Sequence, residues 1–221
     1  FKSELNILDS APRVILDSEF GLCTVGSNVK EAQIVNDIYS HTMKIIKQSC
    51  DLGGYKALPE EDIFNVEYWE LEQAKLKKNN NAAMLSGKIA VVTGAASGIG
   101  KATVDTLIMN GTTVVGLDIS ENVLLNKNIN FSGIICDVSD EASVEEAVYQ
   151  VVLKFGGIDI LVLNAGIFPK SEKVENINFS DWSKVFNINL DANLFLLKHT
   201  FPFIKNATLG GGNVVVVGSK N

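Results

Sequence analysis

The sequence predicts an α/β fold with a parallel sheet covered by helices on both faces, preceded by a small α+β extension. Two observations support this prediction. From residue 85 onward, apolar runs rich in Val and Ile alternate with segments of helical character, as in sheets that are buried on both faces. A glycine-rich turn joins the first of these apolar runs to the first helical segment. We therefore expect two domains, residues 1–84 and residues 85–221.

The sequence of the first domain predicts a hairpin followed by a helix. Short apolar runs at residues 12–16 and 22–25 are separated by polar residues and a glycine, which is consistent with a hairpin. Ser27 or Asn28 could cap a helix that extends to about Gln48, because apolar side chains then recur at spacings of three and four.

A second helix and a linker are expected before the sheet. Pro59 can open this helix, since acidic residues follow in its first turn and lysines gather toward its end at about Lys77. Residues 77–81 are polar and rich in asparagine, which favours a linker.

The second domain predicts a regular alternation of strands and helices. Strands are expected at residues 88–93, 113–118, 132–136, 158–163 and 213–218. Helices are expected at about residues 98–110, 140–155 and 180–205. Right-handed crossovers bring the loops after parallel strands to one edge of a sheet, so residues just after each strand are the candidates for ligand binding.

The glycine-rich turn after the first of these strands has the features of a phosphate-binding loop. Gly94, Gly98 and Gly100 lack the Cβ atoms that would keep a pyrophosphate away, and the positive end of the following helix faces the same space. The next strand ends at Asp118, whose carboxylate can accept hydrogen bonds from both ribose hydroxyls of an adenosine. That carboxylate would repel the 2′-phosphate of NADP, and no Lys or Arg stands in the loop or just after Asp118. We expect a dinucleotide site that prefers NAD; the alternative is a turn without a ligand.

The same residues carry a family resemblance. The run Thr93-Gly94-x-x-x-Gly98-Ile99-Gly100 resembles the cofactor motif of the short-chain dehydrogenase/reductase family. Further landmarks follow in the order of the family: Asp137-Val138, Asn164-Ala165-Gly166, Asn189-Leu190 and the run from Gly212 to Ser219. The resemblance covers about residues 85–221. It implies a Rossmann fold with a doubly wound sheet, a nicotinamide cofactor, and hydride transfer to or from a carbonyl or an alcohol.

The resemblance assigns roles to the residues after each strand. Asp137 and Val138 would hold the adenine, although an acid at this point could instead cap the next helix. The small residues after Asn164 would let the backbone approach the ribose beside the nicotinamide; the family usually has a second Asn where this chain has Leu163. The implied cofactor-binding residues are Gly94, Ser97, Gly98, Ile99, Gly100, Asp118, Asp137, Val138, Asn164, Ala165 and Gly166.

Two further residues match catalytic positions of the family. Asn189 would hold a water that relays protons, and it lies in a helix where a buried, unpaired amide would be costly. That helix is predicted to bury Val185, Phe186, Leu190, Leu194 and Leu197. Ser219 follows the run from Val214 to Val217, which predicts a buried strand, and would hydrogen-bond the substrate oxygen. The alternative is a strand-end serine that caps a turn.

The general acid/base of the family is a Tyr about a dozen residues beyond the serine, followed four residues later by a Lys. None of the four tyrosines in this chain has a Lys four residues later. We therefore expect the dehydrogenase domain to be truncated after its fifth strand, and the chain to bind its cofactor with little or no turnover.

The first domain has a resemblance of its own. Residues 12–46 resemble the end of a class II aldolase domain, and residues 55–76 resemble its junction to a dehydrogenase. In that family a metal-binding His precedes the glycine where this chain has Phe20-Gly21, so aldolase chemistry is not assigned here. The pairing resembles bifunctional rhamnulose-1-phosphate aldolase/alcohol dehydrogenase proteins, and implies NAD-linked oxidation of a small hydroxy-aldehyde or sugar-derived alcohol. The alternatives are a polyol or sugar-alcohol-phosphate (sorbitol-6-phosphate-like) dehydrogenase and a non-catalytic dinucleotide-binding module.

Composition restricts the partners. A net charge of −7 argues against nucleic acid and anionic membranes, and no apolar run reaches the length of a membrane span. Three sparsely spaced cysteines fit neither a disulfide framework nor a zinc site, and two histidines do not build a metal site alone. We expect a cytoplasmic protein without a metal that acts on a small carbonyl or alcohol. A truncated sheet would leave the run from Val214 to Val217 as an apolar edge, so we expect a homo-oligomer that pairs through this strand; the alternative is that the first domain folds over the open side.

Overall fold

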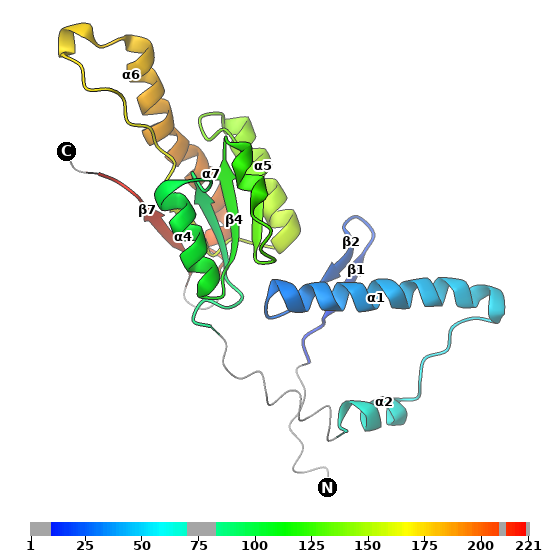
Figure 1. Cartoon of the computed structure of the whole chain (residues 1–221). Helices are drawn as coiled ribbons and strands as arrows, with labels where there is room; N and C mark the ends of the chain where they lie inside the picture. Colours follow the sequence, from blue (N-terminus) through cyan, green and yellow to red (C-terminus); the bar gives the residue numbers. More distant parts are fainter. Residues whose placement is uncertain (1–9, 70–82, 208–210, 220–221) are drawn as a thin grey trace. The chain divides into compact units, whose positions relative to one another are not determined.

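A computed structural model describes residues 10–69, 83–207 and 211–219. Contacts between residues divide the chain into two compact units, Phe1–Ala83 and Met84–Asn221. Each unit is described by itself below, with the elements labelled as in Figure 1.

The first unit contains the expected hairpin and helix. Strands β1 (Val14–Asp17) and β2 (Gly21–Thr24) pair in antiparallel register, with Val14 opposite Thr24. Helix α1 (Val29–Ser49) packs against this hairpin and continues into a short 3-10 turn, η2 (Cys50–Leu52). The Asn28 side chain accepts a hydrogen bond from Glu31 N, so Asn28 is the N-cap, one of the two caps predicted.

The second helix of this unit is shorter than predicted. Helix α2 (Glu60–Glu67) begins after Pro59 as expected, but Tyr68 already leaves the helical conformation. Its N–H still bonds to Phe64 O at 3.0 Å, and the two aromatic rings stack with centroids 4.7 Å apart. The predicted helix end at Lys77 and the predicted linker lie outside the described residues.

The second unit is a five-stranded parallel sheet in the order β5-β4-β3-β6-β7. Its strands are β3 (Ile89–Thr93), β4 (Thr113–Asp118), β5 (Phe131–Ile135), β6 (Ile160–Leu163) and β7 (Asn213–Val216). The predicted strands agree with these spans within two residues at either end. The strand order reverses at β3, because the chain runs outward to β4 and β5 and then returns to β6. A dinucleotide crevice in such sheets lies at the carboxyl ends of the strands beside this reversal.

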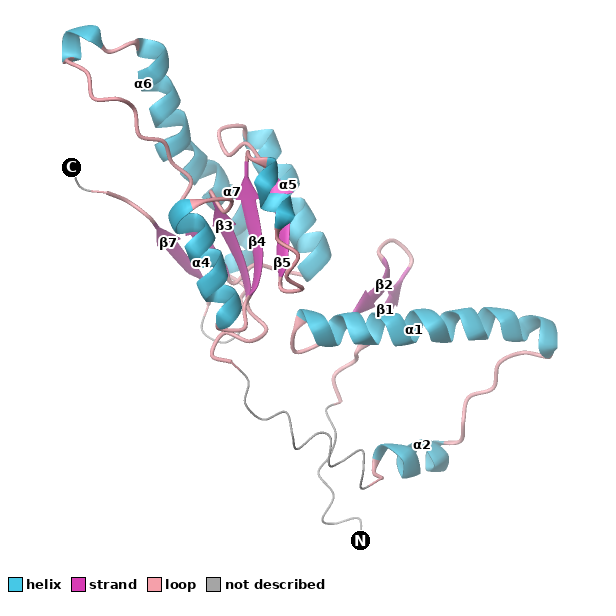
Figure 2. Cartoon of the chain, in the orientation of Figure 1, coloured by secondary structure: helices cyan, strands magenta, loops and turns pink. Residues whose placement is uncertain are grey.

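Helices cover both faces of the sheet (Figure 2). They are α4 (Gly98–Met109), α5 (Glu141–Phe155) and α7 (Ala192–Ile204). One core cluster joins Val91 and Val115 of the sheet to α5 and α7, whereas the other joins Ala90 and Val92 to Val104 of α4. Alternate residues of one strand thus enter opposite cores, which explains the continuous apolar runs and confirms the predicted fold class.

The long helix predicted at residues 180–205 is interrupted. Helix α6 (Phe179–Phe186) passes into a π-helical turn, η5 (Asn187–Asp191), before α7 begins. The N–H of Ala192 reaches back five residues to Asn187 O, which inserts one extra residue into the helical turn. The smaller turns η3 (Glu121–Leu125) and η4 (Val174–Asn176) lie in the connections after β4 and β6.

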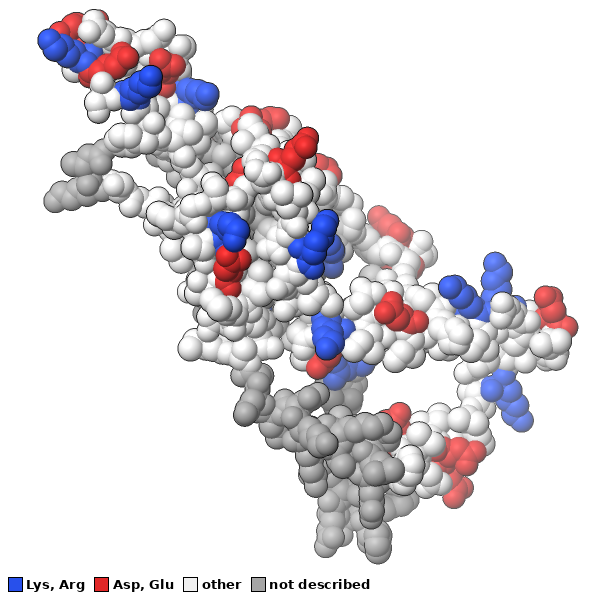
Figure 3. Space-filling model, viewed as in Figure 1, with Lys and Arg blue, Asp and Glu red and all other residues white. Residues whose placement is uncertain are grey.

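Among the described residues, no helix is both long enough and apolar enough to cross a membrane. On the face shown in Figure 3, acidic and basic side chains are interspersed and separated by uncharged surface.

Candidate functional site

The loop between β3 and α4 is held by the end of the neighbouring strand β4. Gly94 N and Ala95 N donate to Leu117 O at 2.8 and 3.3 Å. Ala96 N donates to the Asp118 carboxylate, 2.9 Å from its Oδ2 atom. Three successive N–H groups are therefore fixed by two residues of β4.

Each glycine of this loop meets a different constraint. Gly94 has a φ of +66°, and a Cβ there would lie 2.8 Å from Asn164 Nδ2. A Cβ on Gly100 would collide with the carbonyl oxygen of Gly94. Gly98 has a φ of +53° and no heavy atom within 4 Å of its Cβ position, so a side chain there would project into open space. Gly94 and Gly100 permit the close packing of the loop, and Gly98 keeps the space before α4 empty.

The start of α4 offers backbone N–H groups to that space. Ser97 is the N-cap, but its side chain makes no capping hydrogen bond, and the first turn contains no acidic residue. The first helical bond joins Lys101 N to Ser97 O at 3.0 Å, so the N–H groups of residues 98–100 have no partner within the helix. Outward N–H groups together with the positive end of the helix dipole favour an anion such as a phosphate.

Asp118 lies at the end of β4, beside the loop that leads into α4. Its Oδ2 accepts from Ala96 N and its Oδ1 accepts from Ser120 N, both at 2.9 Å. The nearest lysine along α4, Lys101, pairs with Asp105 at 2.9 Å on the exposed helix surface. Each carboxylate oxygen can accept a further hydrogen bond, and the loop at residues 94–100 contains no Lys or Arg.

Asp137 and Val138 follow β5 at the same edge of the sheet. The Asp137 carboxylate accepts from Ser139 N at 2.9 Å and from Ser139 Oγ at 2.7 Å. The N-cap of α5 is Asp140, whose side chain accepts from Ala142 N. The helix-capping role that was an alternative for Asp137 thus belongs to Asp140. Val138 is buried while Asp137 is exposed.

Asn164 ties the end of β6 to the glycine-rich loop. Its Nδ2 donates to Thr93 O at 2.9 Å and to Gly94 O at 3.3 Å. In return, the buried Thr93 hydroxyl accepts from Asn164 N and Ala165 N, both at 2.9 Å, and donates to Val162 O at 3.3 Å. The organising role of Thr93 was not predicted from the sequence. Its signals there are its place at the head of the glycine motif and its polar side chain at the end of an apolar run.

Asn189 lies in the π-helical turn and holds the loop after β6. Its Oδ1 accepts from Ile167 N and its Nδ2 donates to Ile167 O, both at 2.9 Å. Gly166 precedes this peptide, and a Cβ on it would lie 3.3 Å from Asn189 Oδ1. The amide is therefore paired, and its role in holding a water stays a prediction.

The prediction that the helix around Asn189 buries its apolar neighbours is wrong for three of them. Phe186, Leu190 and Leu194 are 41%, 58% and 63% exposed, and Asn189 itself is exposed. Val185 and Leu197 are partly buried. The helical period identifies an apolar face but does not say whether the sheet covers it, and here α5 and β6 contact α7 from its other side.

The prediction that Val214 to Val217 form a buried strand is also wrong. These four side chains are 38% to 62% exposed. Within the described sheet, β7 is an edge strand that pairs with β6 alone, so a Val-rich sequence here does not imply burial. Ser219 follows it and is exposed. The structure thus brings together Thr93, Asn164, Gly94 and Asp118, but does not connect Ser219 to them.

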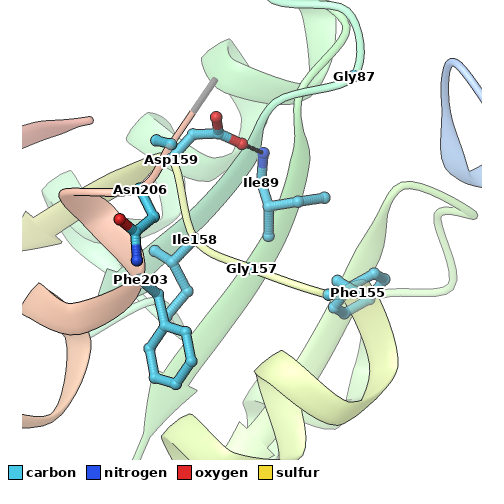
Figure 4. Close-up of a pocket in the computed structure, with 10 residues that line it drawn as sticks. Gly87, Ile89, Phe155, Gly157, Ile158, Asp159, Phe203 and Asn206 are labelled. Carbon is cyan, nitrogen blue, oxygen red and sulfur yellow. Dashed lines mark hydrogen bonds between the residues drawn. The ribbon is translucent and has the colours of Figure 1, made fainter. Parts of the chain in front are cut away.

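A hollow of about 370 Å³ lies at the opposite edge of the sheet (Figure 4). It is lined by Gly87, Ile89, Phe155, Gly156, Gly157, Ile158, Asp159, Phe203, Asn206 and Ala207. The Asp159 carboxylate there accepts from Ile89 N and from Lys88 Nζ, both at 2.9 Å. These residues lie at the beginnings of β3 and β6, so the hollow is separate from the loop that follows β3.

Comparisons with known proteins agree with this geometry. Residues 88–221 match the family model "short chain dehydrogenase", and residues 2–76 match "Aldolase class II, second domain". The uncharacterized oxidoreductase YuxG of Bacillus subtilis (strain 168) is 30% identical over 97% of this chain and 32% of its own length.

Two solved structures share the fold. The 3-ketoacyl-(acyl-carrier-protein) reductase of Brucella melitensis, complexed with NADH, is 30% identical with a TM-score of 0.53, over 55% of this chain and 52% of its own. The ligand-free aldohexose dehydrogenase of Thermoplasma acidophilum is 26% identical with a TM-score of 0.55, over 62% of this chain and 51% of its own. The chain therefore spans between a third and about half of the relatives named here. The match covers more than half of these 221 residues, and the chain belongs to the short-chain dehydrogenase family.

Proposed function

We propose that the second unit binds NAD in preference to NADP, and that it serves hydride transfer between this cofactor and a small hydroxy-aldehyde or sugar-derived alcohol. The observation that carries the cofactor assignment is the position of the Asp118 carboxylate beside the outward N–H groups of α4. The Brucella melitensis relative was solved with NADH, which supports a nicotinamide dinucleotide.

Each part of the cofactor has matching residues at one edge of the sheet. The N–H groups of residues 98–100 would hold the pyrophosphate, and the open space at Gly98 leaves room for it. Asp118 would accept bonds from the adenosine ribose, and Asp137 with Val138 would border the adenine. The backbone of residues 164–166, held by Thr93 and followed by Ile167, which Asn189 binds, would approach the ribose beside the nicotinamide. The bound cofactor supplies the hydride chemistry, and these residues orient it.

The preference for NAD follows from charge. The 2′-phosphate of NADP would lie next to the Asp118 carboxylate, and two like charges about 4 Å apart repel by about 1 kcal/mol in water and about 4 kcal/mol near a protein surface. Residues 94–100 contain no Lys or Arg, and Lys101, the fourth residue of α4, pairs with Asp105 instead.

The aldehyde or alcohol substrate is proposed from the arrangement of the chain. Two family matches follow one another in this order, aldolase class II and then short chain dehydrogenase. YuxG aligns with 97% of the chain and hence with both parts. An aldolase that cleaves a sugar releases an aldehyde, which a dehydrogenase in the same protein would convert. A polyol or sugar-alcohol-phosphate dehydrogenase is the alternative, and the similarity to an aldohexose dehydrogenase favours a sugar in either case.

Turnover and assembly are separate proposals. Because none of the tyrosines is followed four residues later by a Lys, we propose that these 221 residues bind the cofactor with little turnover of their own, as a dinucleotide-binding module.

An apolar stripe lies along α6, η5 and α7 and supports self-association. Its exposed side chains are Trp182, Phe186, Leu190 and Leu194. Free cysteines at positions 23, 50 and 136 suit a reducing compartment such as the cytoplasm.

Fluorescence titration of the 221-residue chain with NADH and with NADPH tests the cofactor assignment. We expect both to bind at the same site and NADH to bind more tightly. Equal affinities, or tighter binding of NADPH, would contradict the proposed role of Asp118 in cofactor choice.

A further inference from the structure

The glycine-rich loop is anchored to β4 through two kinds of acceptor. Gly94 N and Ala95 N bond to the backbone carbonyl of Leu117, which any side chain at that position would leave in place. Ala96 N instead bonds to the Asp118 side chain, 2.9 Å from Oδ2. The third anchor of the loop therefore depends on one carboxylate.

We infer that Asp118 is also a positioning residue, which holds the loop in its binding conformation before the cofactor arrives. This inference rests on the proposed function, in which the same carboxylate binds the ribose. Both roles fit one side chain, because an ionised carboxylate has about four lone-pair sites. Ala96 N and Ser120 N each occupy one site, on different oxygens, so each oxygen keeps a site for a ribose hydroxyl.

The loop needs this anchor because of its composition. Gly94 and Gly98 both have positive φ values, and glycines lose more conformational freedom on ordering than other residues. Between the bond of Ala95 N and the first helical bond of Lys101 N, the Asp118 carboxylate is the acceptor for Ala96 N. The Ser97 side chain adds no capping bond to this segment. A hydrogen bond to a charged acceptor is stronger than one between neutral groups, so its loss should loosen residues 96–100.

This double role has a consequence for cofactor choice. Replacing Asp118 with Ala removes the repulsion of a 2′-phosphate, but also releases the loop on which the pyrophosphate of either cofactor depends. The affinity of Asp118→Ala for NADPH should therefore stay well below the affinity of the unchanged chain for NADH. If Asp118 acted only by repelling the 2′-phosphate, and neither bound the ribose nor positioned the loop, the two affinities would instead come together.

Amide hydrogen exchange, followed by NMR on the full chain without cofactor, tests the inference directly. The exchange of Ala96 should accelerate roughly tenfold to a hundredfold in Asp118→Ala, the range expected for one hydrogen bond to a charged acceptor. Asp118→Asn, which keeps a neutral acceptor, should show a smaller acceleration. The control is Asp105→Ala, which removes another carboxylate near the loop, one that pairs with Lys101 on the exposed side of α4. It should leave Ala96 unchanged.

The amides of β3 serve as an internal reference for the fold. If the β3 amides also exchange faster in Asp118→Ala, that variant has destabilised the whole fold, and Asp118→Asn becomes the test. In Asp118→Asn, the Ala96 amide must then exchange faster than it does in Asp105→Ala. Exchange of Ala96 at the rate of the control would overturn the positioning role. Because no cofactor is present, the result does not depend on whether NADH binds. Tight NADH binding with unaltered Ala96 exchange would refute this inference and leave the proposed function intact.

Discussion

Replacing Gly98 with Ala separates the stability of the fold from the binding of the cofactor. Gly98 has a φ of +53° and an open space around its Cβ position. An Ala side chain would therefore strain the backbone without displacing any neighbour. Left-handed backbone costs a residue other than glycine about 1–2 kcal/mol. At about 2–4 °C per kcal/mol for a chain of this size, Tm should fall by about 2–8 °C.

Cofactor binding should suffer more than stability does. The added methyl group enters the space in front of the α4 amides, where the pyrophosphate would approach. Loss of a single hydrogen bond to a charged group costs about 1.5–3 kcal/mol, which corresponds to a Kd for NADH raised at least about tenfold. Fluorescence titration measures this Kd, and differential scanning calorimetry measures Tm.

The chain contains a matched control in Gly156, which ends α5 with a φ of +81° and also has no heavy atom within 4 Å of its Cβ position. Gly156→Ala should lower Tm by a similar amount, because it imposes the same kind of backbone strain. Gly156 lines the hollow at the other edge of the sheet, so the Kd of the Gly156→Ala variant for NADH should equal that of the unchanged chain. If both variants bind NADH equally well, the pyrophosphate does not lie at the start of α4 and the reasoning is refuted.

Three other predictions concern the hydrogen bonds around the site. Thr93→Val removes a buried hydroxyl and leaves two backbone N–H groups after β6 without their acceptor, so the free energy of unfolding should fall by about 1–3 kcal/mol or more, with Thr93→Ser restoring it in chemical denaturation. Asn189→Ala removes both bonds to Ile167 and should speed proteolysis within residues 167–178, with little change in Tm because these groups are exposed; unchanged cleavage would show that the bonds do not order the loop. The hydrogen bond from Lys198 lowers the pKa of Glu141, so this pair stabilises the fold at a pH above the ordinary pKa of a glutamate, and the stabilisation is lost as pH falls through the lowered pKa. In a plot of Tm against pH, Glu141→Gln should therefore show a smaller fall of Tm at acid pH. A curve parallel to that of the unchanged chain would contradict this.

The sheet was predictable because its strands are apolar and β-branched over their whole length. Few folds other than a parallel sheet covered on both faces can bury such runs between helical segments. Gly94, Gly98 and Gly100 then indicate the edge of the sheet at which a ligand is expected. Capping residues such as Asn28 could be predicted because the side-chain hydrogen bond that caps the start of a helix joins near neighbours in the chain.

The remaining features depend on contacts that local sequence does not encode. The π-helical turn at residues 187–191 is rich in Asn and Asp, but these residues do not by themselves distinguish a π-helical turn from a helix end or an α-helix. The exposure of Val214 to Val217 is set by which other elements lie beside β7 and over its two faces, and not by the residues of β7. The hydroxyl of Thr93 becomes an organising group only when β6, far along the chain, ends next to it.

We propose that a nicotinamide dinucleotide binds at the carboxyl edge of the sheet and that Asp118 selects NAD. Parallel NMR titrations of the isotope-labelled chain with NADH and NADPH test it most directly, because each backbone amide reports its own environment. We predict that the signals of residues 94–100 and 164–166 shift first, and at lower concentrations of NADH than of NADPH. Shifts centred instead on residues 156–159, at the hollow on the opposite edge, or a response to NADPH at the lower concentration, would contradict the claim.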